Sequence, residues 1–239
     1  MIQAKQLTKV YGAGESMVRA LKEVNLDIEK GEMVSIVGPS GCGKSTLLHV
    51  LSGIDNPTEG KVHIDGFDLY GSKERDLSSF RLTQMGFVFQ SFHLLPVLTA
   101  LENVALPLIG QGFPTKNANE NARAALKQVG LEDKLNSRPS QLSGGQNQRI
   151  AIARAIVSKP VVIWADEPTG ALDSHTSQQI VGLLRHINET MGTTIVMVTH
   201  DISISQQTDR IICMENGRII NVDIVNNSKL SHSIKSVTK

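Results

Sequence analysis

Short runs of aliphatic residues, each bounded by glycine or polar residues, recur along the chain and predict buried β-strands. Met33–Val37 lies between two glycines, and Val161–Ala165 and Thr194–Thr199 have the same character. Helical patterns separate these runs, so we expect a mainly parallel sheet with helices on both faces. Further strands are predicted at Lys61–Ile64, Met85–Phe89, and the pair Ile211–Met214 and Arg218–Val222, joined as a hairpin through Glu215, Asn216 and Gly217.

Apolar residues at helical spacing predict helices between the strands. One helix begins at Asp173 or Ser174, either of which can cap it, and ends at Gly192. A second begins after Ser143, and a third covers Asn117–Val129. The apolar stripe of the first helix consists of Ile180, Leu183, Leu184, Ile187 and Met191.

The order of these elements predicts how the chain is divided. Residues 91–157 carry mostly helical patterns with strands on both sides, so we predict a helical subdomain there, inserted into an α/β core of 1–90 and 158–222. The tail at 223–239 is rich in Ser, Asn and Lys, which is typical of a flexible segment. No internal repeat is visible, so one such unit is expected.

Composition excludes several functional classes. The net charge is +1 and aromatic residues make up 4% of the chain, which argues against nucleic acid as the main partner. No apolar run reaches the roughly 18 residues of a membrane span, and the N-terminus lacks an apolar signal core. No Cys or His pair has metal-ligand spacing. We therefore expect a cytosolic protein without a zinc site, whose membrane role would require a partner chain.

A glycine-rich loop follows the strand Met33–Val37. Residues 38–46 read GPSGCGKST and fit GxxxxGK[ST], with a strand before the loop and a helix starting near its end. Glycines let backbone N–H groups turn inward around phosphate oxygens, and the helix N-terminus favours the same anion. Lys44 is expected to reach the β- and γ-phosphates, and the Ser45 hydroxyl to bind Mg²⁺. The predicted nucleotide-binding residues of the loop are Gly38, Ser40, Gly41, Cys42, Gly43, Lys44, Ser45 and Thr46.

The cysteines are Cys42 and Cys213. Since Cys42 lies inside the phosphate loop, a structural disulfide is not expected and a reducing compartment fits. Cys42 can be a small residue that fills the loop. Alternatively, it is a reactive thiol that ATP protects from alkylation, because helix N-termini and nearby lysines activate thiols.

Two further segments bear on the same chemistry. Asp166 and Glu167 follow a buried strand, at the carboxyl end where ligands bind in such sheets. Leu142–Gln146 (LSGGQ) opens a helix whose free N–H groups, hydroxyl and dipole make a second anion site. One phosphate loop and a separate anion-binding helix start leave the chain with a spare half-site, formed by Ser143, Gly144, Gly145 and Gln146.

Read in order, GPSGCGKST, Gln90, LSGGQ, VVIWADE at 161–167 and His200 resemble the ATP-binding-cassette (ABC) family, and the resemblance runs from about Met1 to Val222. It implies a RecA-like P-loop NTPase fold, with a mainly parallel sheet, antiparallel additions and an inserted helical subdomain. It also implies ATP and Mg²⁺ as ligands and ATP hydrolysis as the activity.

The resemblance assigns roles to individual residues. Asp166 would hold Mg²⁺ directly or through water, and Glu167 would orient and activate the attacking water. Gln90 would contact Mg²⁺ or the water and couple nucleotide state to the helical subdomain. His200 would contact the γ-phosphate, and Tyr11 would stack on adenine. The resemblance also places Lys44 among the catalytic residues. It places Asp173, in the loop that follows Glu167, among the nucleotide-binding residues.

In this family the spare half-site closes on the ATP of a second copy, head to tail, so that two ATP molecules lie between two chains. ATP favours the closed dimer and ADP does not, so hydrolysis resets the machine. Two departures are visible: Gly170 stands where many members have Ser, and Asn147 where Gln is common. Neither removes a catalytic group, so two competent sites are expected.

Phe92–Leu108 and the run from Asp166 to Asp173 resemble one bacterial branch, which serves macrolide-type exporters, lipoprotein release, cell division and bacitracin-type peptide resistance. In that branch the ATPase sits at the cytoplasmic face of the membrane and drives an integral membrane permease. Phe92–Leu108 would then meet the permease, or form subdomain core, or both. An exporter or resistance system is the favoured reading, with lipoprotein release or cell division as the alternative.

Three other functional classes can be compared with an ABC transporter ATPase. A soluble ABC ATPase acting on nucleic acid or ribosomes usually has a coiled-coil insertion, two cassettes or a basic surface, and the sequence shows none of these. A P-loop kinase is disfavoured by LSGGQ and by Glu167. The sequence does not distinguish an active ATPase from a nucleotide-gated scaffold with low ATP turnover.

Overall fold

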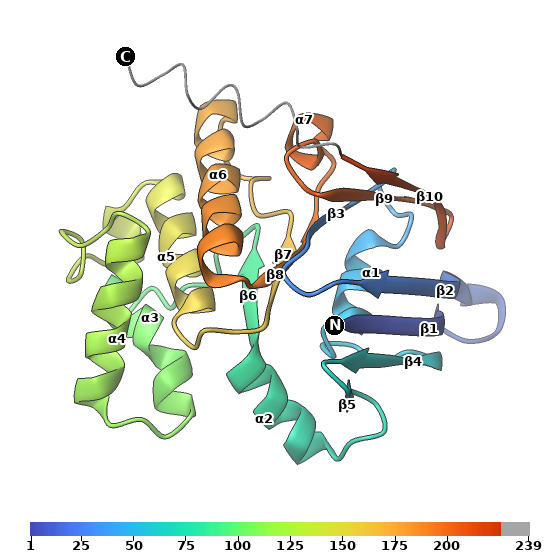
Figure 1. The fold of residues 1–239 in the computed structure, drawn as a ribbon, viewed down its shortest axis with the longest axis horizontal. Coiled ribbons are helices and arrows are strands. Elements are labelled where there is room, and N and C mark those ends of the chain that lie inside the picture. The colour runs from blue at the N-terminus through green and yellow to red at the C-terminus, as the bar shows by residue number, and fades with distance from the viewer. Residues whose placement is uncertain (226–239) are drawn as a thin grey trace.

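The computed structural model describes residues 1–225 and contains two sheets with helices packed around them (Figure 1). The larger sheet has the strand order β10-β9-β3-β8-β7-β6, and all its pairs except β9–β10 are parallel. Its strands are β3 (Met33–Val37), β6 (Met85–Phe89), β7 (Val162–Asp166), β8 (Thr194–Val198), β9 (Arg210–Glu215) and β10 (Arg218–Ile224). The predicted strands and the β9–β10 hairpin are confirmed, with ends within two residues of those expected.

The smaller sheet is antiparallel, in the order β2-β1-β4-β5. Its strands are β1 (Ile2–Tyr11), β2 (Val18–Ile28), β4 (Glu59–Ile64) and β5 (Phe67–Asp68). The pattern had predicted only β4, because β1 and β2 pair through several register shifts. Gln6 and Glu23 adopt positive φ near these shifts, so the alternation of apolar and polar residues is interrupted.

The larger sheet separates two apolar cores, since successive residues of its strands point to opposite faces. Val34 and Val196 join the core that contains helix α1 (Lys44–Leu51) and the inner face of the smaller sheet. Met33 and Ile195 join the core on the other face, with helix α6 (Ser174–Met191). α6 begins after its cap Asp173 and ends before Gly192, which is left-handed, as predicted.

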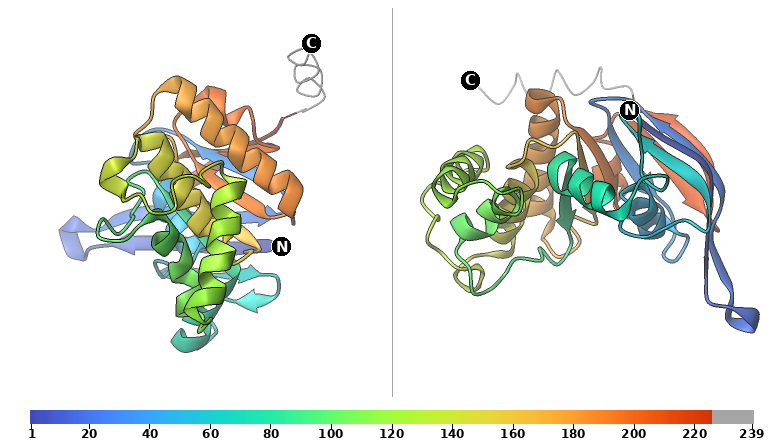
Figure 2. Two further views of the ribbon diagram at one scale, coloured as in Figure 1. Left: turned by 90° about the vertical axis from the view of Figure 1, so that its left-hand side faces the viewer. Right: turned by 90° about the horizontal axis from the view of Figure 1, so that it is seen from below.

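Three helices between β6 and β7 gather at one end of the molecule: α3 (Ala100–Gly110), α4 (Thr115–Gln128) and α5 (Gly144–Ile156) (Figures 1 and 2). The mostly helical character expected for 91–157 is therefore confirmed, including the helix after Ser143. Their buried residues continue into the core beneath α6. The remaining helices are α2 (Glu74–Gln84), the short α7 (Ile202–Ser205), and 3-10 turns η1 (Gly14–Ser16) and η2 (Pro139–Gln141).

The expectation of a flexible tail from residue 223 is wrong at its start. Asp223 and Ile224 continue β10 and pair with Ile211 and Arg210 of β9, since the Ser-, Asn- and Lys-rich composition begins only at Asn226. The rest of the predicted tail, 226–239, lies outside the described residues. Within 1–225, the helices are too short or too polar to cross a bilayer.

Candidate functional site

The phosphate loop connects β3 to α1 and encloses a cavity of about 360 Å³. Two glycines are required by close packing of the loop against its neighbours. A Cβ on Gly38 would lie 2.2 Å from the carbonyl oxygen of Met214, and one on Gly43 would lie 2.5 Å from that of Ala20. Gly43 also has φ of 107°, which disfavours a side chain. Residues 40–46 line the cavity. They include Ser40, Gly41, Cys42 and Thr46, which were predicted to bind nucleotide.

Cations face this cavity from two elements. Lys44 is buried, and its Nζ donates to the carbonyls of Gly38 and Pro39 at 2.9 Å, which keeps the ammonium within the loop. Arg19 and Lys22 of β2 line the same cavity. The sequence pattern indicates neither residue, because it does not reveal β2. Three cationic side chains around one cavity favour a polyphosphate ligand.

The carboxyl ends of β6, β7 and β8 lie side by side. Phe89 pairs with Asp166, and Asp166 pairs with Val198. Gln90, which directly follows β6, and His200, two residues beyond β8, therefore emerge at the same edge as the carboxylates. The parallel sheet thus brings together groups that are distant in sequence, at the edge where such sheets bind ligands.

Oxygen donors surround a second cavity of about 300 Å³, lined by Ser45, Gln90, Asp166 and Glu167 among others. The Ser45 hydroxyl donates to Oδ1 of Asp166 at 3.0 Å. His49 Nε2, from α1, lies 3.5 Å from Oδ2 of the same carboxylate. A hydroxyl, an amide and a carboxylate beside a phosphate site are the oxygen ligands that Mg²⁺ prefers. The donor set therefore fits Mg²⁺, and His49 is a neighbour that the sequence analysis did not identify.

Glu167 lies where three cavities meet, since it lines the phosphate-loop cavity, the Ser45–Asp166 cavity and a third cavity beside His200. Its backbone has φ of 47°, and its N–H donates to the carbonyl of Val198 at 3.1 Å. Such a conformation is costly for a residue with a side chain and often marks a functional site. Its Oε2 is 3.4 Å from Nδ1 of His200. The partly buried carboxylate thus lies beside an exposed imidazole.

Tyr11 ends β1 opposite Val18, a residue that lines the phosphate-loop cavity. Its ring is partly exposed, and its hydroxyl donates to Asp55 at 2.6 Å and also interacts with the side chain of Thr46. Burial, followed by the hydrogen bond to Asp55, raises the pKa of Tyr11. The ring therefore remains a neutral flat surface beside the loop.

The LSGGQ segment lies elsewhere. Ser143 caps α5 and exchanges hydrogen bonds with Gln146, at 2.9 and 3.2 Å. Gly144 and Gly145 pack against Leu172 and Thr176, and a Cβ on Gly145 would lie 2.6 Å from the Thr176 methyl carbon. In the described part of the chain, none of these four signature residues lines the phosphate-loop cavity.

Asp173 caps α6 by accepting hydrogen bonds from the N–H and hydroxyl of Thr176, and the hydroxyl bond is the larger cause of its lowered pKa. The cavity beside His200 is lined by its neighbours Leu172 and Ser174 but not by Asp173 itself. Its nucleotide contact stays a prediction.

Two side chains of α5 that the sequence analysis missed hold the segment after β6. Gln148 is fully buried and donates to the carbonyls of Phe89 and Pro168, so it links the ends of β6 and β7. Arg154 donates to the carbonyls of Phe92 and His93, both at positive φ. Burial lowers the pKa of Arg154. Their only sequence signal is a position on the helix that LSGGQ opens, and side-chain contacts between segments about sixty residues apart are not visible in a pattern.

The fold, the phosphate loop and the acidic strand end define a P-loop nucleoside triphosphatase. The family model described as ABC transporter matches residues 21–170, and the chain belongs to this family of ATP-hydrolysing cassettes. An uncharacterized ABC transporter ATP-binding protein of Methanocaldococcus jannaschii, MJ0796, is 49% identical over 92% of this chain and 95% of its own length. Its dimeric post-hydrolysis structure, bound to ADP and Pi, has a TM-score of 0.87 at 46% identity and covers 95% of this chain and 99% of that one.

Two named relatives belong to the branch expected from the sequence. The lipoprotein-releasing system ATP-binding protein LolD of Bacteroides fragilis is 45% identical over 92% of this chain and its whole length. The macrolide export ATP-binding/permease protein MacB of Vibrio parahaemolyticus is 44% identical over 92% of this chain, which spans 34% of MacB. This chain is therefore the ATP-binding part of a transporter.

Proposed function

We propose that two copies of this chain close around two Mg-ATP and drive an integral membrane permease of the macrolide-export and lipoprotein-release branch. The observation that carries the proposal is the place of Glu167 at the junction of three cavities. A triphosphate in the first cavity and oxygen ligands in the second would leave a water beside this carboxylate.

The residues divide the hydrolytic step between them. Glu167 would orient the water and take its proton as the water oxygen attacks the γ-phosphorus, while the bond to the β–γ bridging oxygen breaks and ADP leaves. Lys44 would offset the charge on the β- and γ-phosphates. His200, 3.4 Å from Glu167, would contact the γ-phosphate and hold the carboxylate. Bound Mg²⁺, held by Ser45, Asp166 and Gln90, would supply charge neutralisation at the phosphate oxygens.

The separation of the signature from the phosphate loop supports pairing of two chains. Ser143, which caps α5, is exposed and does not line the phosphate-loop cavity of its own chain. A second copy, turned head to tail, would place it against the phosphates. That MJ0796 forms a dimer supports the same arrangement here.

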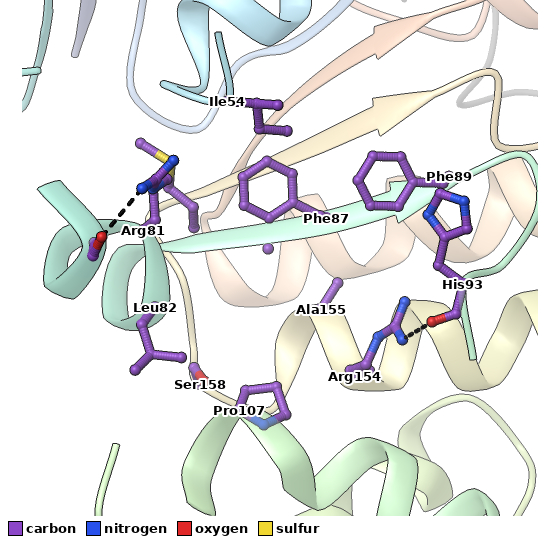
Figure 3. A pocket seen from close by; sticks show the side chains of 13 residues that line it. Ile54, Arg81, Leu82, Phe87, Phe89, His93, Pro107, Arg154, Ala155 and Ser158 are labelled. Carbon is purple, nitrogen blue, oxygen red and sulfur yellow. Dashed lines mark hydrogen bonds between the residues drawn. The ribbon is translucent and has the colours of Figure 1, made fainter. Parts of the chain in front are cut away.

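An apolar groove of about 650 Å³ offers a place for the permease (Figure 3). It is lined by Phe87 and Phe89 of β6 and by Leu82, Pro107 and Ala155 from three helices. β6 leads directly to Gln90. A permease segment seated here would therefore touch the strand that ends at the nucleotide site, which is a physical route for coupling.

The expected permease surface, Phe92–Leu108, is divided by the structure. Leu95 and Val97 are exposed, whereas Val104 and Leu108 belong to the core. Of this run, only His93 and Pro107 line the groove. We propose that the contact uses the groove together with the exposed part of 92–99.

The test is an affinity pull-down of Glu167→Gln from detergent-solubilised native membranes with Mg-ATP, with Lys44→Ala as the nucleotide-binding control. ATP-dependent recovery of a permease with a large extracytoplasmic domain supports the branch. Recovery of a many-span importer with its binding protein, or of soluble partners alone, contradicts it.

A further inference from the structure

The phenol ring of Tyr11 is held by a cluster outside the phosphate loop. Its hydroxyl donates to Oδ2 of Asp55 at 2.6 Å, and Nζ of Lys9 lies 4.8 Å from its ring centroid. Lys9 also contacts Oδ1 of Asp55 at 2.6 Å. The three side chains form a closed triangle, in which each contacts the other two.

The triangle makes the ring one-sided. Lys9 covers one face of Tyr11, since the ammonium lies over the ring and is fixed by Asp55 and by the carbonyl of Asn56 at 2.6 Å. A cation over an aromatic face is attracted by the ring quadrupole. Since Tyr11 is also 41% exposed, a planar ligand would have to stack on the face opposite Lys9.

Asp55 is itself fixed to the helix that follows the phosphate loop. Its N–H donates to the carbonyl of His49 at 3.2 Å, and its carbonyl accepts from the hydroxyl of Tyr70 at 2.8 Å. That hydroxyl also reaches the carbonyl of Val50, and burial raises the pKa of Tyr70. The orientation of the Tyr11 ring is thus tied to α1, whose other end carries Lys44.

We propose that Lys9 and Asp55 are positioning residues that fix the free face of Tyr11 beside the phosphate loop for stacking on a purine base. The inference rests on the proposed stacking of Tyr11 on the base. A ring held in place before binding loses no further rotamer freedom when the base arrives. The cluster then contributes to affinity for the base and not to affinity for the polyphosphate.

The experiment compares two ligands that differ by the adenosine group, ADP and pyrophosphate, both with Mg²⁺, by titration calorimetry on the full chain. ADP is used because it does not favour the closed dimer. For Lys9→Met and Asp55→Ala we expect the Kd for ADP to rise about fivefold, the value of one hydrogen bond or cation–π contact, with the Kd for pyrophosphate unchanged. Asp55→Asn, which retains an acceptor for the tyrosine hydroxyl, should be intermediate. Lys5→Met, an exposed lysine of the same strand, is the matched control and should change neither Kd.

Tyr11→Ala separates the stacking role of Tyr11 from the positioning role of Lys9 and Asp55. If Tyr11→Ala raises only the Kd for ADP, and Lys9→Met and Asp55→Ala do not raise it, Tyr11 binds the base but the positioning role is wrong. If Tyr11→Ala changes neither the Kd for ADP nor the Kd for pyrophosphate, the stacking role and the positioning role are both wrong. If the Lys9 and Asp55 variants weaken ADP and pyrophosphate equally, they act through the phosphate loop, which also contradicts the inference.

Discussion

The side chain of Gln90 packs directly over Gly170. A Cβ on Gly170 would lie 2.8 Å from Nε2 and 2.9 Å from Cδ of Gln90. Because Gly170 has no Cβ, it leaves room for the side chain of Gln90. This contact links the segment that follows β6 to the loop that follows Glu167.

Gly170→Ala should displace Gln90 rather than strain the backbone, since Gly170 is not left-handed. We expect a changed Mg²⁺ dependence of ATP hydrolysis, because Gln90 lines the cavity with Ser45 and Asp166. A double-mutant cycle with Gln90→Ala measures the contact. In the Gln90→Ala background, Gly170→Ala should have little further effect. An equal effect in both backgrounds would show that the loop itself, and not Gln90, responds.

Ser143→Arg should bind ATP with unchanged affinity and lose turnover, because Ser143 does not line the phosphate-loop cavity of its own chain. Calorimetric ATP affinity and steady-state phosphate release measure the two effects. Ser143→Asn, which keeps a capping side chain, controls for destabilisation of α5. A parallel loss of ATP affinity in Ser143→Arg would place the signature within its own site.

Arg154→Met should lower the free energy of unfolding by about 2–4 kcal/mol, because the carbonyls of Phe92 and His93 lose two hydrogen bonds from a charged donor. Thermal unfolding measures this loss. Arg154→Lys should recover only part of it, since an ammonium lacks the planar fork of a guanidinium. Equal stability of all three proteins would show that the contact contributes nothing.

Leu82→Asp should reduce ATPase stimulation by the reconstituted permease and leave the basal rate unchanged, because Leu82 lines the apolar groove and none of the three cavities around Glu167. Ile220→Asp, at an exposed apolar position on β10, is the matched control. If Leu82→Asp leaves the ATPase stimulation unchanged, or if Ile220→Asp lowers it equally, the groove does not couple the permease to the ATPase.

The larger sheet and α6 could be predicted because their signals are local. Met33–Val37 is a short run in which every residue except Ser35 is apolar, and Asp173 and Gly192 mark the ends of one helix. β1 and β2 could not, because their register shifts disrupt the alternation on which strand prediction depends. With β2 missed, Arg19 and Lys22 could not be placed at the cavity.

The residues of the candidate site could likewise be predicted only in part. Motifs placed Lys44, Asp166 and Glu167 together, since each follows a recognisable strand. They did not indicate Gln148 or Asp55, whose contacts are made across the fold to backbone carbonyls and to Tyr11. Such positions depend on three-dimensional packing and carry no spacing signal.

The most direct test of the account is the mass of Glu167→Gln in solution, by size-exclusion chromatography with light scattering, with and without saturating Mg-ATP. Because this variant should bind ATP and not hydrolyse it, we expect a monomer without nucleotide and a stable dimer with Mg-ATP. ADP should give no dimer, and Glu167→Gln combined with Ser143→Arg should stay monomeric. A Glu167→Gln chain that binds Mg-ATP and remains a monomer would contradict the paired mechanism.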